Sequence, residues 1–219
     1  MDSAIAEFIE TEQHQKLKEN LSKHRYLIDD FFQRVRDLHL DLEKVFFELV
    51  FCLCTPQSKA VYCRDAVLRM KDDGLLWIGT KQQLLNYMQP VRFNDKKSDY
   101  IIMAREHFDE IYRKILELQR QPRELREWLA ENVMGFGFKE ASHFLRNIGL
   151  GDELAILDVH ILREMQELGI MNQANGGLSK NAYLQAEAKF AGLAKALGMT
   201  TAELDCTIWL TRSGSGELM

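Results

Sequence analysis

Residues 133–141 read Val-Met-Gly-Phe-Gly-Phe-Lys-Glu-Ala, and residues 154–161 read Leu-Ala-Ile-Leu-Asp-Val-His-Ile. The apolar spacing on both sides of the first segment predicts a helix that enters a Gly-x-Gly turn and a second helix that leaves it. Glycine at positions 135 and 137 permits positive φ and a close approach of the backbone. The N–H groups at the start of the second helix have no intrahelical partner, which makes this end a natural seat for a phosphate. The window therefore predicts two helices joined by a tight hairpin at about residues 130–148.

Two ionisable residues of this window stand at predicted helix starts. Lys139 lies just inside the second helix of the hairpin, and Asp158 opens a further helix 19 residues later, after the apolar run 154–157. Each has an ordinary interpretation by itself, Lys139 as a solvated surface lysine and Asp158 as an N-cap. A Gly-x-Gly turn is also common. It is the hairpin, the lysine and the aspartate together, at this spacing, that indicate a functional site.

The rest of the chain follows the same helical period. Apolar residues form an i, i+3, i+4 stripe over 42–53, and a longer stripe predicts a single helix over 94–120. Thr-x-x-Gln at 80–83 and Thr-x-x-Glu at 200–203 are capping boxes. The sequence contains only 3 Pro and 13 Gly and shows no strand-like alternation. These patterns predict an all-α protein.

Composition limits the class of protein further. Apolar residues make up 46% of the 219 residues and charged residues 28%, which is the mix of a folded globular chain. No run reaches the roughly 18 apolar residues of a membrane span. The start Met1-Asp2-Ser3 shows no secretory signal. The net charge of −5 argues at first against a nucleic-acid binder.

The four cysteines raise the question of a metal site. Cys52, Cys54 and Cys63 lie within twelve residues, but there is no CxxC pair and no histidine beside them. Cys52 and Cys54 belong to an apolar helical run, where free cysteine usually serves as a small core residue. We therefore expect core cysteines in a reducing, cytoplasmic compartment, and no cofactor.

With these features in place, the chain resembles the helix–hairpin–helix DNA glycosylase superfamily. In that superfamily a hairpin lysine 19 residues before an aspartate marks the bifunctional glycosylase/lyases. More narrowly, the chain is similar to the type 2, archaeal-type 8-oxoguanine DNA glycosylases. The matching segments are 91–93, 97–106, 137–147, 154–162 and 209–214, and the similarity covers roughly residues 40–214.

The resemblance implies a fold of two interlocked helical subdomains with a central DNA-binding cleft. Residues 1–219 then form a single glycosylase unit with the helix–hairpin–helix at about 130–148. The expected subdomains are residues 1–40 together with helices in 178–219, and a central core of residues 41–170.

The resemblance also implies an activity in base excision repair, that of a DNA N-glycosylase and AP lyase acting on 8-oxoguanine. A lysine amine attacks the sugar C1′, expels the damaged base and forms a Schiff base, after which β-elimination nicks the strand. A carboxylate supports the cationic sugar and assists proton transfer. These roles fall on Lys139 and Asp158. The helix dipole disfavours a cation at the first position and favours an anion at the second.

Three residues match family positions that touch the duplex around the lesion. Arg92 and Phe93 correspond to the pair that reads the base opposite the lesion, one polar and one wedge-like. Gln57 lies in a loop that reaches the minor groove and is the candidate to fill the space left by the extruded base. Packing in the core before a long helix is the ordinary alternative for Phe93.

Other matched positions concern the damaged base and the DNA backbone. Trp209 is the candidate for stacking on the flipped base, with a core tryptophan as the alternative. His160 is a candidate organiser of the site or simply a residue of a capped helix. Gly135 and Gly137 form the hairpin that contacts DNA and, in this superfamily, holds a structural cation between its carbonyls and a phosphate.

One departure from the family pattern lies at the C-terminus. Family members end soon after the segment that matches 211–214, with a terminal carboxylate or lysine that helps to bind 8-oxoguanine. This sequence continues to Met219. The departure concerns the preference for the damaged base more than the excision chemistry.

Two other functions remain open at this point. A glycosylase for another oxidised base is one, although Cys206 is the only cysteine in the C-terminal region, which excludes the four-cysteine iron–sulfur cluster of pyrimidine enzymes. A helix–hairpin–helix protein that binds DNA without catalysis is the other, with Lys139 as a phosphate contact. Nicking of an abasic duplex distinguishes a glycosylase/lyase from a protein that only binds DNA.

The expected partner is double-stranded DNA containing oxidised guanine, bound by a monomer away from any membrane, with the nucleoid if the cell is prokaryotic. A net charge of −5 is compatible with this partner because DNA binding depends on where positive charge lies. We expect a basic rim around Lys139. It comprises Arg92, Lys96, Lys97, Lys139, Arg146 and Arg163.

Overall fold

The computed structural model describes residues 12–171, 178–213 and 218. Within these residues the regular elements are twelve α-helices and one short 3₁₀-helix, without a strand, which confirms the all-α prediction. The chain divides into a central unit, residues 37–150, and a terminal unit, residues 1–36 with 151–219. The tail residues 214–217 and Met219 lie outside the described part of the chain.

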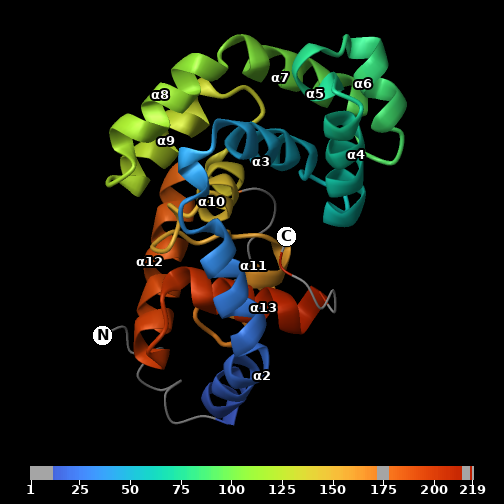
Figure 1. Cartoon of the computed structure of the whole chain (residues 1–219). Coiled ribbons are helices and arrows are strands. Elements are labelled where there is room, and N and C mark those ends of the chain that lie inside the picture. Colours follow the sequence, from blue (N-terminus) through green and yellow to red (C-terminus); the bar gives the residue numbers. More distant parts are fainter. Residues whose placement is uncertain (1–11, 172–177, 214–217, 219) are drawn as a thin grey trace. The chain divides into compact units, whose positions relative to one another are not determined.

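The central unit is built around helix α3 (Leu42–Cys54), in which every residue from Val45 to Cys54 is buried. Burial of each large apolar side chain there contributes about 1.5–3 kcal/mol. Helices α4, α7, α8 and α10 pack against α3 (Figure 1). The other elements are η1 (Leu38–Leu40), α4 (Ala60–Asp72), α5 (Leu75–Ile78), α6 (Lys81–Tyr87), α7 (Asn94–Glu106), α8 (Phe108–Leu118), α9 (Pro122–Asn132) and α10 (Phe138–Asn147).

The single helix predicted over 94–120 is wrong, because the chain breaks between α7 and α8 at His107. This residue has φ −104° and ψ 9°. The break places the Phe108 ring against Phe46 and Trp77, with centroid separations of 4.8 and 5.3 Å. Both halves keep a helical period. The apolar pattern therefore does not reveal a one-residue interruption that aromatic packing stabilises.

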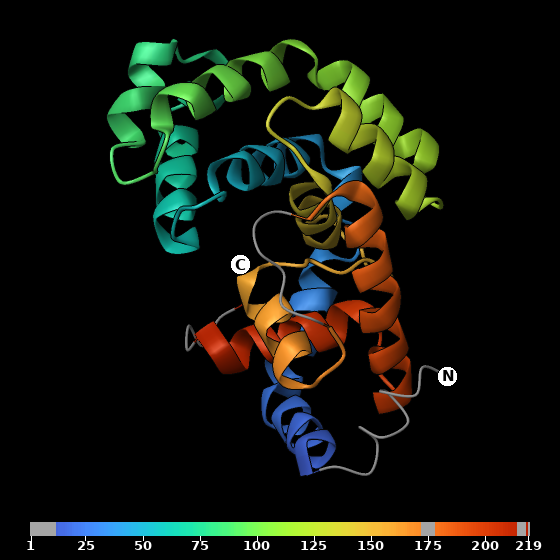
Figure 2. The same ribbon diagram turned by 180° about the vertical axis from the view of Figure 1, so that it is seen from behind.

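The terminal unit consists of α2 (Glu12–Val35), α11 (Val159–Glu167), α12 (Lys180–Leu197) and α13 (Thr201–Ser213). Helix α13 packs against α2, α11 and α12, which Figure 2 shows from behind. Residues 151–170 group with these helices, whereas the sequence prediction had placed them with the central core. Buried side chains of α12 and α13 bind the backbone of this segment and so account for the grouping.

Several local predictions are confirmed. Both capping boxes form, at Thr80 with Gln83 and at Thr200 with Glu203. The four cysteines are buried and free, as expected of core residues. No helix in the described ranges combines the length and the apolarity that crossing a membrane requires.

Candidate active site

The hairpin between α9 and α10 is closed by backbone hydrogen bonds and by a glycine that no other residue can replace without strain. The N–H of Phe136 donates to the carbonyl oxygen of Val133 at 3.0 Å. Gly135 has φ +96°, and a Cβ there would lie 2.5 Å from Cδ2 of Tyr100 and 3.1 Å from Cδ2 of Leu53. The turn thus rests directly on α7 and α3, and both the positive φ and the close contact require glycine.

Lys139 is the second residue of α10, and its amine faces Glu140. Gly137 is the N-cap, and its N–H donates to Oε2 of Glu140 at 3.3 Å. The other oxygen of the same carboxylate, Oε1, lies 3.7 Å from Nζ of Lys139, whose side chain is 28% exposed. Glu140 therefore caps the helix with one oxygen and faces the lysine amine with the other.

Buried polar groups attach α10 to its neighbours in the central unit. Nδ2 of Asn147 donates to Oε2 of Glu48 on α3 at 2.9 Å, and Nε of Arg146 donates to Oδ1 of Asn147 at 3.3 Å. Burial raises the pKa of Glu48, and the nearby Arg64 guanidinium opposes that shift. On the other side, Nη1 of Arg126 on α9 donates to Oγ of Ser142 at 3.3 Å.

The predicted basic rim is wrong for two of its members. Arg146 is 7% exposed and Lys97 only 4% exposed, so neither presents its charge to solvent. Both side chains are used inside the central unit, Arg146 in the network at α10 and Lys97 in a cluster described below. Arg92, Lys96 and Arg163 are exposed.

Asp158 is the N-cap of α11 in the terminal unit. Its Oδ1 accepts hydrogen bonds from the N–H groups of His160 at 2.8 Å and Ile161 at 2.9 Å. Among the described residues, no hydrogen bond is made to its Oδ2. The ordinary N-cap interpretation is therefore correct for Oδ1.

The loop before Asp158 is held by three buried side chains, one for each of three successive N–H groups. Ala155 donates to Oε1 of Glu187 at 3.0 Å, Ile156 to Oδ2 of Asp205 at 3.0 Å, and Leu157 to the hydroxyl of Tyr183 at 3.3 Å. The same hydroxyl donates to the carbonyl oxygen of Ala155 at 2.7 Å. A buried loop must have its backbone groups paired, and here α12 and α13 supply the partners.

The three residues predicted to touch the duplex lie in two adjacent turns of the central unit, 55–58 and 91–93. Gln57 and Phe93 are exposed, Phe93 by 57%, and both have left-handed backbones with φ of 56° and 58°. They are the two non-glycine residues with positive φ in the described part of the chain. The N–H of Arg92 donates to Oγ of Ser58 at 3.0 Å and joins the turns. Phe93 is not the core residue that the alternative interpretation required.

Two further predicted residues belong to the terminal unit. Trp209 on α13 and His160 on α11 are both partly buried. His143 of α10 packs edge to face against Phe51, with ring centroids 5.7 Å apart. In the described ranges, no group of three His, Cys, Asp or Glu side chains is arranged to hold a metal ion.

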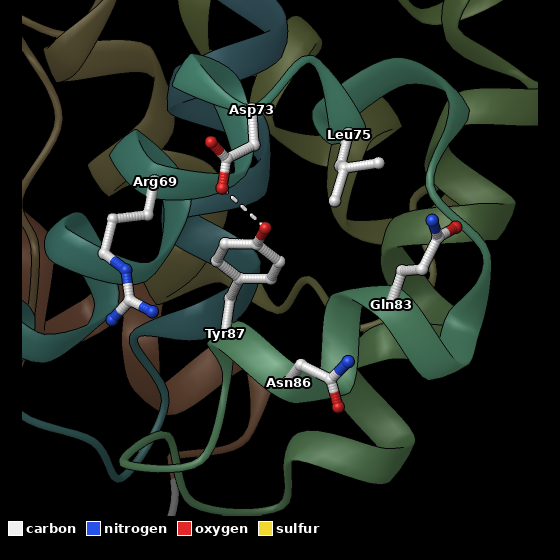
Figure 3. A pocket seen from close by; sticks show the side chains of 6 residues that line it. All are labelled: Arg69, Asp73, Leu75, Gln83, Asn86 and Tyr87. Atoms are coloured by element: carbon white, nitrogen blue, oxygen red, sulfur yellow. Dashed lines mark hydrogen bonds between the residues drawn. The ribbon is translucent and has the colours of Figure 1, made fainter.

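A polar pocket on α4 to α6 lies apart from these residues in the sequence and contains none of them. Figure 3 shows its lining, in which the Tyr87 hydroxyl donates to Oδ2 of Asp73 at 2.6 Å. Arg69 stands over the Tyr87 ring at 5.3 Å. These groups satisfy one another, and we assign no role to the pocket.

Sequence reasoning missed Glu140 and the residues that hold the loop before Asp158, and it placed the buried Lys97 on the surface. Glu140 could have been found, because Gly137-x-x-Glu140 has capping-box spacing. Glu187 also carries a signal. It shares the buried stripe of Tyr183 and Phe190 at i, i+4 and i+7, where a carboxylate needs a partner.

Helices α9 and α10 and the tight turn between them form a helix–hairpin–helix motif. The family model described as 8-oxoguanine DNA glycosylase matches residues 27–199. An 8-oxoguanine DNA glycosylase/AP lyase of Fusobacterium nucleatum is 34% identical over 183 residues, covering 82% of this chain and 81% of the relative. One from Methanocaldococcus jannaschii is 35% identical and covers 78% and 82%.

Solved structures agree with these matches. The 8-oxoguanine DNA glycosylase of Thermotoga maritima superposes with a TM-score of 0.86 at 27% identity, covering 94% of this chain and 99% of the other. The Methanocaldococcus jannaschii glycosylase/lyase in complex with a 15mer DNA containing 8-oxoguanine gives 0.83 at 28% identity, covering 93% and 100%. The chain belongs to the 8-oxoguanine DNA glycosylase family.

Proposed function

We propose that this protein removes 8-oxoguanine from duplex DNA and nicks the strand, with Lys139 as the nucleophile and Asp158 as the supporting carboxylate. The observation that carries the proposal is the family match over residues 27–199, which includes the hairpin, Lys139 and Asp158 together. The relatives named 8-oxoguanine DNA glycosylase/AP lyase support the same activity.

The reaction needs one amine and one carboxylate. The Lys139 amine, in its neutral form, forms a bond to C1′ while the bond from C1′ to N9 of the base breaks, and the base leaves with the electron pair and takes up a proton. Opening of the sugar ring gives the Schiff base. Loss of a proton from C2′ then expels the 3′ phosphate and cuts the strand. Asp158 stabilises the positive charge that develops on the sugar and assists the proton transfers.

The geometry of Lys139 supports its role. The hairpin fixes the backbone at Gly135, while the partly exposed Lys139 side chain forms a long ion pair with the Glu140 carboxylate, at 3.7 Å. A nucleophile must leave its resting partner to reach C1′, and a single long ion pair is a weak restraint. The N-terminus of α10 also presents backbone N–H groups suited to a DNA phosphate.

Other residues would hold the DNA open around the lesion. The exposed Phe93 and Gln57 are placed to enter the duplex, with Arg92 beside Phe93, its guanidinium 5.8 Å from the ring centroid. Trp209 would stack on the extruded base. We expect the protein to act as a monomer on oxidised duplex DNA in the cytoplasm, at the nucleoid if the cell is prokaryotic.

A cleavage panel tests the activity. Duplexes carrying 8-oxoguanine opposite each normal base should be cut, and those carrying uracil or thymine glycol should not. An abasic duplex should be nicked. Cutting of thymine glycol alone would indicate another oxidised base as the substrate, and binding without any nicking would indicate a protein that only binds DNA.

Borohydride trapping tests the residue. Lys139→Gln should abolish both base release and the trapped protein–DNA adduct. Lys114→Gln is the matched control, because Lys114 is a lysine of the same unit paired with Glu117 at 2.7 Å on the surface of α8. A trapped adduct with Lys139→Gln would show that another amine is the nucleophile.

A further inference from the structure

Lys97 is a buried lysine whose amine is fully engaged by neutral oxygen atoms. Its Nζ donates to the carbonyl oxygens of Cys54 and Pro56, both at 2.7 Å, and to Oγ of Ser58 at 3.1 Å. Only an ammonium group has three protons to donate. Burial lowers the pKa of Lys97, and the positive charge of Lys139 acts in the same direction. A charge is thus kept in a place that disfavours it, which calls for a functional explanation.

Lys97 forms hydrogen bonds next to Gln57 and to Phe93, the two residues with left-handed backbones. Pro56 and Ser58, which bind the amine, are the two neighbours of Gln57. The backbone N–H of Lys97 donates to the carbonyl oxygen of Phe93 at 3.0 Å. Ser58 completes the connection, because its Oγ accepts both from the Lys97 amine and from the N–H of Arg92, the residue before Phe93. One residue therefore connects the turn 55–58 to the turn 91–93.

The left-handed conformation itself points to function. It is unfavourable for residues with a Cβ, most of all for a bulky one such as Phe93, and persists only where the surroundings enforce it. In both turns it accompanies an exposed side chain, on Gln57 and on Phe93. The end of α3 at Cys54 offsets part of the cost of burying this charge, because carbonyl oxygens and the helix dipole at a helix C-terminus favour a cation.

We propose that Lys97 is a positioning residue that locks the two turns so that Gln57 and Phe93 enter the DNA together. It does not contact DNA, in contrast to the surface role expected from the sequence. This inference rests on the proposed function, because the two side chains act on the duplex only if the protein opens it around a lesion. Lys97 holds Gln57 and Phe93 in place before DNA binds, so that DNA binding does not have to order these two side chains.

The first test measures insertion of the two side chains into the duplex by fluorescence, a readout separate from the excision rate. A duplex carries 2-aminopurine opposite the 8-oxoguanine site, and its fluorescence rises when the base loses its stacking. Wild-type protein at saturation should raise the fluorescence, and Lys97→Met should reduce that rise at least threefold. Lys81→Met is the matched control, since the Lys81 amine bonds surface carboxylates, those of Asp95 and Asp99 on α7, and not the buried oxygens that hold Lys97. It should behave as wild type.

The second test separates positioning from general stability. Single-turnover excision by Lys97→Met should be at least tenfold slower than by wild type. In a background already carrying Gln57→Ala and Phe93→Ala, the same change should slow excision less than twofold, because the residues it positions are gone. An equal loss in both backgrounds would mean that Lys97 only supports the fold, and would overturn the inference.

Ser58→Ala keeps the inference testable if Lys97→Met does not fold. It removes the acceptor shared by Lys97 and Arg92 and should weaken the fluorescence rise in the same direction, by about half. The outcomes also separate the two proposals. If the wild-type protein excises nothing, the proposed function is wrong, and the fluorescence assay still shows whether the two side chains enter the duplex. Suppose instead that wild type excises normally. Either no fluorescence rise, or an equal rise in Lys97→Met, would then overturn the role of Lys97 and leave the proposed function standing.

Discussion

Lys139 and Asp158 stand at similar places, each in the first turn or cap of a helix, yet they are held in opposite ways. Asp158 is fixed through Oδ1 by two N–H groups of α11, after a loop whose N–H groups are bound by buried side chains. Lys139 has a rigid backbone behind it, set by the packing of Gly135, and a side chain with one long ion pair to Glu140.

The difference fits the roles that we propose for the two groups. A carboxylate that stabilises developing charge works best when its position does not change during the reaction, so hydrogen bonds from the backbone suit it. A nucleophile has to travel to C1′ and form a bond, so a firm base and a long, loosely held side chain suit it. Hydrogen bonds fix the position of the aspartate, whereas close packing around Gly135 fixes the backbone that carries the lysine.

The largest expected effect is the removal of the charge on Asp158 while its fixed position is kept. Asp158→Asn retains an oxygen that can accept from the N–H groups of His160 and Ile161. We expect excision of 8-oxoguanine to slow by about 10²–10⁴-fold, with the free energy of unfolding changed by less than about 0.5 kcal/mol. Single-turnover rates and thermal denaturation measure the two quantities.

Asp158→Ala completes this test. It also removes the cap, and should lower the free energy of unfolding by about a further 1 kcal/mol. A wild-type excision rate in Asp158→Asn would show that the aspartate serves the fold and not the reaction.

Gly135→Ala should displace the start of α10 and, with it, Lys139. The new Cβ would lie 2.5 Å from the Tyr100 ring at a residue with φ +96°, and left-handed strain with overpacking should cost about 3 kcal/mol in total. Gly74→Ala is the control in the same unit. Gly74 has φ +69° with nothing within 4 Å of its Cβ position, so strain alone should cost about 1 kcal/mol.

Chemical denaturation of the two glycine variants gives the difference directly. Excision should fall in Gly135→Ala, because the start of α10 must shift, and stay near wild type in Gly74→Ala. Equal destabilisation by the two changes would mean that the Tyr100 contact contributes nothing to the hairpin.

The sequence predicted what depends on neighbouring residues and failed where the partner is distant. The caps at Thr80, Thr200 and Asp158 were found because their donors lie two or three residues away. The bonds from Ala155 to Glu187 and from Ile156 to Asp205 span 32 and 49 residues. A carboxylate on an apolar helix face indicates that a partner exists, but the identity of the partner depends on the tertiary fold.

Lys97 was misassigned for the same reason. On a helix that begins with several charged residues, its position looks like one more surface cation, and its neighbour Lys96 is exposed. The acceptors that bury its amine come from the end of α3 and the following turn, about 40 residues earlier in the chain. The hairpin, by contrast, was predicted in the right place because glycine reports directly on backbone conformation.

Tyr183→Phe should have a smaller effect than these changes, because it weakens only the polar support of the loop before Asp158. The change removes one hydroxyl that accepts from Leu157 and donates to Ala155, at a cost of about 1–2 kcal/mol in the free energy of unfolding. If the loop places the aspartate, kcat should fall about three- to tenfold with KM unchanged, because a displaced carboxylate weakens only the transition state. Tyr26→Phe is the matched control, since Tyr26 is 79% exposed on α2 of the same unit, and it should change neither quantity. Loss of stability in Tyr183→Phe with a wild-type kcat would show that the bonds to the loop hold the fold together without tuning the position of Asp158.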